Sequence, residues 1–223
     1  MHMSENKIVS AATVVSKTDG PTSVFILGGA KPRGWKGLKR ALRAKRQKRR
    51  REKVMSSIRP EGRTPDQLVE YICAVYGAKE MDMDSGQYQQ RWRSCKAGLV
   101  QRCAPELIGE SWEVKPPASH DQEELQEFLA QVNALQEKAV SVPEELFPMD
   151  FHVYQITYRT YGEIVLELEK VRGHLNVTVS GNPGKMRRVD REVRKIVEFF
   201  GVTEEDIAEQ TLRYRTMVAV LSH

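Results

Sequence analysis

The sequence predicts an α+β fold, and three observations carry this prediction. Residues 152–179 contain three short segments in which apolar and polar residues alternate, a pattern typical of antiparallel strands with one apolar face. Two segments with the apolar spacing of helices follow, at about 185–200 and from 203 onward. Strands followed by helices indicate a sheet with helices packed on one face. We therefore expect a three-stranded antiparallel meander followed by two helices as the core, with a helical region before it.

Residues 1–30 are expected to form an N-terminal β-hairpin. The segments 7–16 and 22–28 are short and rich in β-branched residues, and the stretch 17–21 between them, Lys-Thr-Asp-Gly-Pro, is a turn signal. If the hairpin is exposed, its edge could pair with a second copy of the chain. A homodimer through this hairpin is therefore an open alternative.

A basic arm and a linker, residues 31–63, come next. Residues 31–53 hold 13 Lys and Arg and one acidic residue, so the rest of the chain has 22 basic and 29 acidic residues, a net charge of −7. Trp35, Leu38 and Leu42 predict a helix at the start of the arm. Beyond Leu42 there is no apolar face until Val54, and the tail from 45 to 53 cannot pack into a core. The thirteen cations of 31–53 repel one another, so this segment is expected to be unfolded or frayed when free. Residues 56–63, with a proline and a glycine, are expected to form a linker.

The region 64–147 is expected to be helical. Thr64, Pro65 and Gln67 together form a capping box with proline at the first helical position, and Gly77 marks the end of that helix. A second helix is expected over 85–104 and a third over 121–139. Their expected inward side chains are Tyr88, Trp92, Cys95, Leu99 and Cys103 in the second, and Leu125, Phe128, Leu129, Val132 and Leu135 in the third.

The α+β domain itself is expected to span 148–223, although 64–223 could equally be one domain. The apolar strand faces are Tyr154, Ile156 and Tyr158, then Ile164, Leu166 and Leu168, then Leu175, Val177 and Val179. The helix at 185–200 is expected to bury Met186, Val189, Val193, Ile196, Val197 and Phe200. Gly201 ends it, and Thr203 caps a final helix with Ile207, Tyr214, Val218 and Leu221 inward.

Several classes of protein are disfavoured by composition. No stretch approaches the roughly 18–20 apolar residues of a membrane-spanning helix, and the N-terminus lacks a secretory signal pattern. Cys73, Cys95 and Cys103 do not form a disulfide framework and are expected to be reduced core thiols. None of the five histidines has metal-ligand spacing to a second His or Cys. We expect a cytoplasmic protein with no metal and no cofactor.

The basic arm is the strongest functional signal. Its partner should be polyanionic, and nucleic acid comes first because phosphate neutralisation with counterion release gives sequence-independent affinity. The sequence thus favours a non-enzymatic nucleic-acid-binding protein, with RNA favoured over DNA. The alternatives are a protein–protein adaptor whose arm docks an acidic partner, an arm docked on the chain's own acidic surface, and, less favoured, an anionic membrane. The candidate contacts are Lys36, Lys39, Arg40, Arg43, Lys45, Arg46, Lys48, Arg49, Arg50 and Arg51.

A second and weaker signal lies in residues 180–188, Ser-Gly-Asn-Pro-Gly-Lys-Met-Arg-Arg, between the last strand and a helix. Glycines allow backbone N–H groups to converge, and cations in a first helical turn oppose the helix dipole unless an anion is bound. The anion-binding candidates are Gly181, Gly184, Lys185, Arg187 and Arg188. The alternatives are a plain strand–helix turn and an enzyme that acts on a phosphorylated small molecule at this loop.

Catalytic machinery is not visible in the sequence. Glu163, Glu167 and Glu169 could act as paired carboxylates, but a solvated strand face is the favoured interpretation. His152 and His174 begin the first and third strands and could meet only if those strands are neighbours. Whether the chain is an enzyme stays uncertain, and the sequence favours a binding protein.

The segment 19–26, Asp-Gly-Pro-Thr-Ser-Val-Phe-Ile, resembles the Asp-Gly-Pro-Thr segment in the beta subunit of sodium-translocating carboxylic-acid decarboxylases. In that family the segment lies in a multispanning membrane protein and its aspartate belongs to the ion pathway, so the resemblance implies an ion-related position for Asp19. The chain as a whole is similar to small soluble proteins of Gram-positive anaerobes that share this segment. The match covers about ten of the 223 residues, and no spanning helix accompanies it, so the resemblance supplies no mechanism for this chain.

Overall fold

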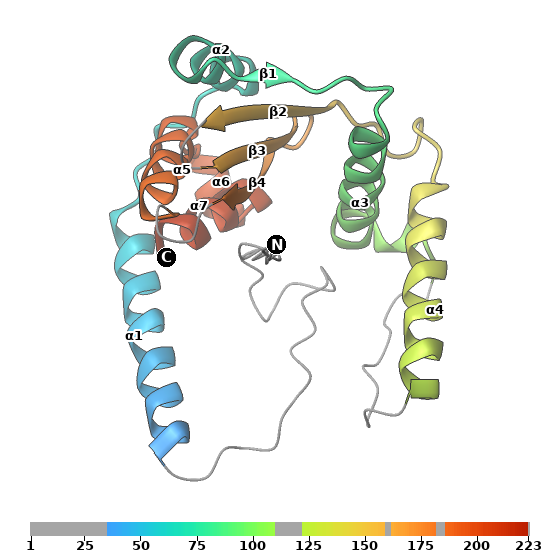
Figure 1. Ribbon diagram of the computed structural model, residues 1–223, viewed down its shortest axis with the longest axis horizontal. Coiled ribbons are helices and arrows are strands. Elements are labelled where there is room, and N and C mark those ends of the chain that lie inside the picture. The colour runs from blue at the N-terminus through green and yellow to red at the C-terminus, as the bar shows by residue number, and fades with distance from the viewer. Residues whose placement is uncertain (1–34, 110–121, 159–161, 182–185, 223) are drawn as a thin grey trace, which may run out of the picture. The chain divides into compact units, whose positions relative to one another are not determined.

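The computed structural model describes residues 35–109, 122–158, 162–181 and 186–222 (Figure 1). The expected hairpin over 7–28 lies outside these ranges. The chain divides into two compact units, the first built mainly from residues 24–80 and 152–223 and the second mainly from 81–151. The α+β class is confirmed, because the first unit combines a β-sheet with helices. Within the described ranges, no helix combines the length and the apolar character that crossing a membrane requires.

The sheet of the first unit has four strands in the order β1-β2-β3-β4, one more than the sequence predicts. The strands are β1 (Lys79–Glu80), β2 (Phe151–Tyr158), β3 (Gly162–Glu169) and β4 (His174–Gly181). β1 pairs antiparallel with β2, and β3 pairs antiparallel with β4. β1 was missed because a two-residue strand is too short to show alternation.

One face of the sheet forms the hydrophobic core. The register places Ile164 opposite Val179 and Leu168 opposite Leu175, so the apolar residues of β3 and β4 share that face. α5 (Met186–Phe200) packs on β3 and β4, and it buries the side chains predicted to point inward, except that Met186 is half-buried. An amphipathic helix thus covers one face of an alternating strand pair, as the residue pattern predicts.

α2 (Pro65–Tyr76) begins and ends where the sequence predicts. The Thr64 hydroxyl accepts a hydrogen bond from the Gln67 backbone N–H at 3.2 Å, and the Gln67 side chain accepts one from the Thr64 N–H at 2.9 Å. Gly77 ends the helix at a φ of 63°, a conformation that glycine adopts without strain. These local signals confirm both predicted ends of the helix.

The last predicted helix is two helices. Thr203 caps α6 (Glu204–Glu209) as expected, but the chain then turns at Gln210, which has a φ of 51°, and α7 (Leu212–Ser222) follows. The sequence contains no glycine or proline at this break, so it gave no signal there. Tyr214 and Val218 of α7 are buried as predicted, while Ile207 and Leu221 are half-buried.

α1 (Trp35–Ser57) is one continuous helix, which corrects the expectation of an unfolded or frayed arm over residues 35–53. Ala, Arg, Lys, Gln and Glu are all strong helix formers, and that propensity outweighs the repulsion between cations. Its C-terminal end packs with α7, and Ile58 just beyond it packs against the core. The predicted linker after α1 is therefore an ordered, packed segment.

The second unit contains α3 (Gly86–Cys103), the short 3-10 helix η1 (Pro105–Leu107) and α4 (Gln122–Val140). α3 packs along α4, and Arg93 donates to both carboxylate oxygens of Glu137 at 2.6 Å. Lys96 is buried, and its Nζ donates to the Val142 carbonyl at 2.6 Å above the ring of Trp92.

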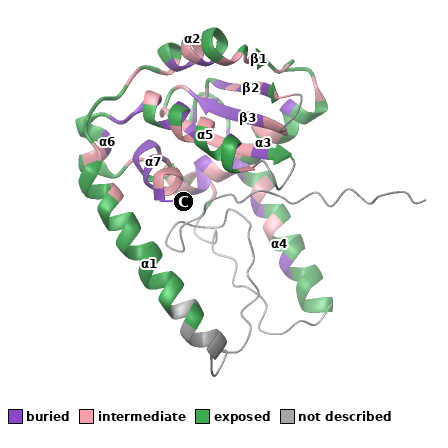
Figure 2. Ribbon diagram, turned by 60° about the vertical axis from the view of Figure 1, so that its left-hand side comes forward, coloured by how far each residue is buried: buried purple, intermediate pink, exposed green. Residues whose placement is uncertain are grey.

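The expected inward stripes of α3 and α4 are only partly correct (Figure 2). Tyr88 and Leu99 are buried, but the buried side of α3 continues through Lys96, Ala97, Val100 and Gln101. In α4, Phe128 and Leu135 are buried and Val132 is half-buried, whereas Leu125 and Leu129 are 38% and 45% exposed. None of the three cysteines forms a disulfide among the described residues, but Cys73 and Cys103 are exposed, so the expectation of core thiols is wrong for both.

Candidate functional site

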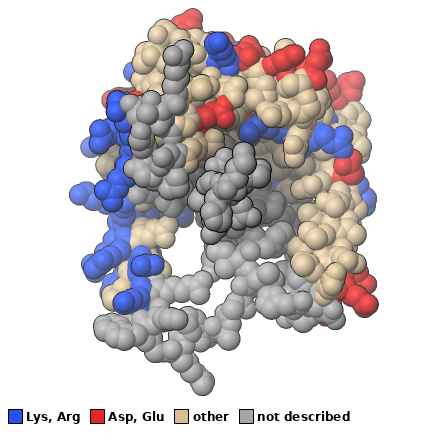
Figure 3. All heavy atoms as spheres, viewed as in Figure 1, with Lys and Arg blue, Asp and Glu red and all other residues tan. Residues whose placement is uncertain are grey.

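α1 presents the predicted basic residues to solvent. Every side chain from Leu42 to Lys53 is exposed, and burial begins only at Val54, which is half-buried (Figure 2). In the space-filling view of Figure 3, Lys and Arg side chains follow α1 and continue past its C-terminal end. Lys39 is also exposed, while the side chains of Lys36 and Arg40 lie outside the description.

The cations of α1 are not spread evenly around its axis. Successive residues of an α-helix are about 100° apart, so spacings of four and three return to the same side. Five cations with this spacing form what we call the α1 stripe: Lys39, Arg43, Arg46, Arg50 and Lys53. Fourteen steps of about 1.5 Å make the stripe about 21 Å long. Lys45, Lys48 and Arg51 lie on the opposite side of the helix.

Few of the cations from Arg43 to Lys53 are neutralised by the part of the chain that the structure describes. Lys48 and Glu52 form an ion pair at 3.9 Å, with both side chains well exposed. Within the described ranges, none of the remaining cations from Arg43 to Lys53 has an ion-pair partner. An arm docked on the chain's own acidic surface would show such pairs, so this arrangement does not favour the self-docked alternative.

Residues 58–63 connect α1 to α2, and we call them the base of α1. They are held by hydrogen bonds to backbone carbonyls. The Arg63 N–H donates to the Phe200 carbonyl at 2.9 Å, and its Nη1 donates to the Phe199 carbonyl at 2.6 Å. Buried Arg213 of α7 donates from Nη2 to the Arg63 carbonyl at 2.7 Å and from Nε to the Gly201 carbonyl at 2.9 Å. These bonds fix the segment between α1 and α2 to the end of α5.

Aromatic contacts reinforce this attachment. The ring of Phe199 lies between the Arg63 guanidinium, 4.3 Å from the ring centroid, and the ring of Tyr71, stacked at 3.7 Å between centroids. The Arg213 guanidinium lies 3.7 Å from the centroid of Phe200. Such stacking suits arginine because its guanidinium is planar and weakly hydrated. α1 is thus presented on a fixed base.

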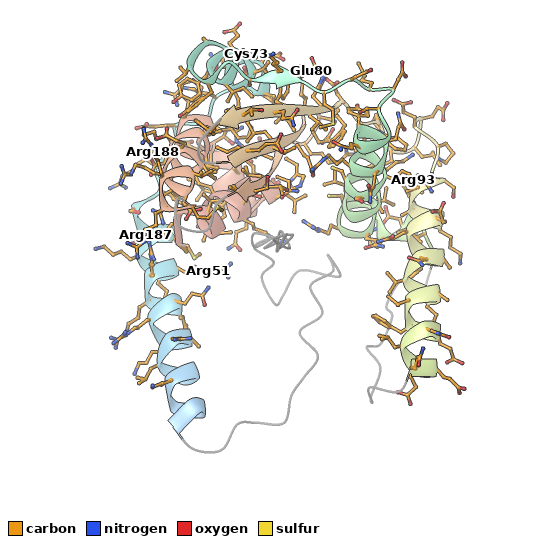
Figure 4. The ribbon with its side chains drawn as sticks, in the orientation of Figure 1. Arg51, Cys73, Glu80, Arg93, Arg187 and Arg188 are labelled. Atoms are coloured by element: carbon orange, nitrogen blue, oxygen red, sulfur yellow. The ribbon has the colours of Figure 1, made fainter. Side chains whose placement is uncertain are left out.

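The second predicted anion site is only partly described. Gly181 is the last residue of β4, and Gly184 and Lys185 lie outside the description. Arg187 and Arg188 are exposed in the first turn of α5, which contains no acidic residue (Figure 4). The structure thus confirms that these two arginines begin a helix and face solvent, and it does not test the loop before them.

The carboxylates of β3 are not a solvated strand face, which corrects that interpretation. Glu167 is 9% exposed and accepts from the amide of Asn176, its cross-strand neighbour, at 2.8 Å. Glu169 has no exposed surface and accepts from the backbone N–H groups of Val171 and Arg172 at 3.1 and 2.9 Å. Burial requires such partners, so these two carboxylates stabilise the strand pair and its turn. Glu163, which is half-buried, accepts from the Gln155 amide.

The two strand histidines do not form a site together. β3 separates β2 from β4, so His152 and His174 are on strands that are not neighbours. His152 instead contacts Glu80 of β1, with 2.5 Å between its Nδ1 and the carboxylate. Within the part of the chain that the structure describes, no group of three or more His, Cys, Asp or Glu side chains could hold a metal ion.

A tyrosine cluster beside α5 was not predicted from the sequence. Tyr76 donates to Glu192 at 3.3 Å, and burial is the main cause that raises the pKa of Tyr76, with further contributions from Tyr71, Glu192 and Tyr158. Burial and Glu192 also raise the pKa of Tyr158, while the charge of Arg188 acts in the opposite direction. These phenols are held in their neutral form. In the sequence, the only signal of this cluster is the pair Tyr71 and Tyr76 in the second half of the helix that starts after Thr64.

The charge is divided between the two units. Residues 24–80 and 152–223 contain 27 Lys and Arg against 15 Asp and Glu, whereas residues 81–151 contain 6 against 13. The net charge of −7 outside the basic arm therefore arises mainly from the second unit. The unit that carries α1 is basic.

Comparison with known proteins adds no assignment. No family model, curated protein or solved structure matches the chain. Functional inference therefore depends on the geometry and charge described above.

Proposed function

We propose that this chain is a non-enzymatic nucleic-acid-binding protein that contacts backbone phosphates through α1, with RNA favoured over DNA. The observation that supports this most is the row of exposed cations from Arg43 to Lys53 without ion-pair partners in the described ranges, except Lys48. Lys and Arg held in this way recruit a polyanion and release its counterions on binding.

Contact through α1 is expected to be largely independent of sequence. Phosphate contacts position a protein on nucleic acid without reading its bases. Within 36–53 there is no Phe, Tyr, Trp or His, so this part of the helix offers no platform for base stacking. Five of the six residues from Arg46 to Arg51 are basic, and four of them are arginines. Arginine can hold a phosphate with two parallel hydrogen bonds.

Fluorescence anisotropy with labelled probes tests the proposal. The probes are an oligouridylate of about 30 nucleotides and a DNA duplex of about 30 base pairs, titrated between about 50 and 200 mM salt. We expect binding that weakens steeply with salt. The slope of log affinity against log salt is negative. The triple variant Arg43→Gln/Arg46→Gln/Arg50→Gln should reduce its magnitude by about 2.1–2.7, at about 0.7–0.9 per lost phosphate contact.

The matched control is Lys45→Gln/Lys48→Gln/Arg51→Gln, which removes the same charge from the opposite side of α1. A smaller loss in this control supports contact through the α1 stripe. Binding that is absent, or that is insensitive to salt, in the wild-type protein overturns the proposal. Capture of a defined acidic protein that survives nuclease treatment, together with no affinity for either probe, would replace it with the adaptor alternative.

A further inference from the structure

We infer that Arg187, Arg188 and Arg191 on α5 form a second phosphate-contacting surface, so that the bound nucleic acid spans both α1 and α5. This inference rests on the proposed function and extends it to residues outside the basic arm. We call these three residues the α5 surface.

The orientation of the α5 surface is fixed by the core. Val189, Val193 and Ile196 on the other side of α5 are buried against the sheet. A helix anchored along one side holds the opposite side in a constant direction, and Arg187, Arg188 and Arg191 are all exposed there. A site on an anchored helix is positioned better than a site on a loop.

The charges of Arg187 and Arg191 are available for a ligand. Arg187 and Arg191 are one turn apart, a spacing at which like charges repel. Among the described residues neither has an ion-pair partner, and Glu192, the acid that follows Arg191 in sequence, bonds to Lys195 at 3.1 Å and to Tyr76. Two adjacent guanidinium groups without a counterion fit the closely spaced phosphates of a nucleic-acid backbone.

Acidic residues limit the extent of this surface. Asp190 lies at its edge, and Glu198, which is exposed two turns after Arg191, lies on the same side of the helix beyond it. The α5 surface is therefore confined to the first two turns of α5. Arg194 in the next turn is half-buried and donates to the Leu221 carbonyl at 3.2 Å, so it serves the fold instead.

α1 and α5 belong to the same unit, and each packs against α7. Figure 4 shows Arg187 and Arg188 at the left edge of the view, where the C-terminal end of α1 also lies, and Figure 3 shows basic side chains along that edge. A single polyanion fits this positive side. A ligand that bound α1 alone or α5 alone would leave the repulsion between the cations of the other helix unneutralised.

The double variant Arg187→Gln/Arg191→Gln tests the inference, again by anisotropy with the labelled oligouridylate. Its control is Lys79→Gln/Arg215→Gln, which removes two exposed cations of the same unit from β1 and α7. If the α5 surface contacts phosphates, the double variant should reduce the magnitude of the salt slope by about 1.4–1.8 relative to wild type, while the control stays close to wild type. Thermal unfolding of both variants should match the wild type, since all four side chains are exposed.

The outcomes separate the inference from the proposed function. If the α5 variant binds with the affinity and slope of its control while the α1 stripe variant loses binding, the second surface is overturned and contact through α1 stands. If the α5 variant loses binding and the α1 stripe variant does not, α1 is not the interface and the bipartite surface is overturned as well. If wild type itself does not bind the probe, both fail.

Discussion

Arg213 and Arg63 are joined by a hydrogen bond of 2.7 Å from the guanidinium Nη2 of the first to the backbone carbonyl of the second, across 150 positions of sequence. The same Nη2 also donates to the Phe200 carbonyl at 2.5 Å. Arg63 stands where the chain passes from α1 into α2, so this one buried side chain connects the base of the basic helix to the ends of α5 and α7. This connection holds the base of α1 in one position, so that the α1 cations are presented in a constant direction.

Replacing this guanidinium should loosen that base. In Arg213→Lys a compact ammonium cannot reach three carbonyl oxygens in different directions, and the unsatisfied buried groups should cost about 2–4 kcal/mol of the free energy of unfolding. Urea denaturation measures the loss, and hydrogen exchange should rise over 58–63. Arg215→Lys, an exposed position on the same helix, should stay within about 0.5 kcal/mol of wild type. Equal stability of the two variants would contradict the role given to Arg213.

Asp206 should give the protein a stability that depends on pH. Burial alone raises its pKa, but hydrogen bonds from the Thr203 backbone and from the hydroxyls of Thr211 and Thr203, with the charge of Arg213, outweigh burial and lower the pKa. A carboxyl whose pKa is lower in the folded than in the unfolded state stabilises fully above the unfolded value, near 3.9. That contribution is lost as the pH falls from there through the folded pKa.

The measurement is the difference in the free energy of unfolding between pH 6 and pH 3. It should be smaller for Asp206→Asn than for wild type, because the amide cannot titrate. Asp84→Asn, at an exposed aspartate of the second unit, should leave the difference unchanged. A pH dependence in Asp206→Asn as steep as in wild type would show that other carboxyls account for acid unfolding.

The close packing beside the base of α1 makes a further prediction. A Cβ on Gly62 would lie 2.7 Å from the backbone carbon of Val202, so Gly62→Ala should destabilise the fold by about 1–3 kcal/mol. At Gly86, the first residue of α3, an added Cβ meets nothing within 4 Å. There the same substitution should be neutral or stabilise by about 0.4–1 kcal/mol. Urea midpoints of the two variants that shift in the same direction would argue against the packing explanation.

The sequence was sufficient where structure is determined by near neighbours. The Thr64–Gln67 capping box and the alternation of Ile164, Leu166 and Leu168 each act over a few residues, and the structure confirms them. The break at Gln210 was not predictable, because a non-glycine residue holds a positive φ there and no glycine or proline marks the turn. The burial of Glu169 was missed because its partners are backbone N–H groups of a turn, which no periodicity reveals.

The candidate site, too, was predictable from the sequence only in part. A dense run of Lys and Arg identifies the α1 cations from composition alone. Their continuous helix was not predicted, because repulsion between cations favours a frayed arm, whereas helix propensity and the packing of Ile58 against the core stabilise the helix. The fixed base could not be predicted at all, because Arg63 and Arg213 meet only in the folded protein.

Whether α1 must be helical to bind can be separated from its charge. Gln47→Pro leaves every cation in place but removes a backbone hydrogen bond in the middle of α1 and costs about 3 kcal/mol of helix stability. The α1 stripe would then break between Arg46 and Arg50, and a disordered arm must lose conformational freedom on binding. We expect weaker binding of the oligouridylate than for Gln47→Ala, which keeps the helix, with circular dichroism to measure the helix lost. Equal affinities for the two variants would mean that α1 binds as a flexible chain and that its stripe has no role beyond charge.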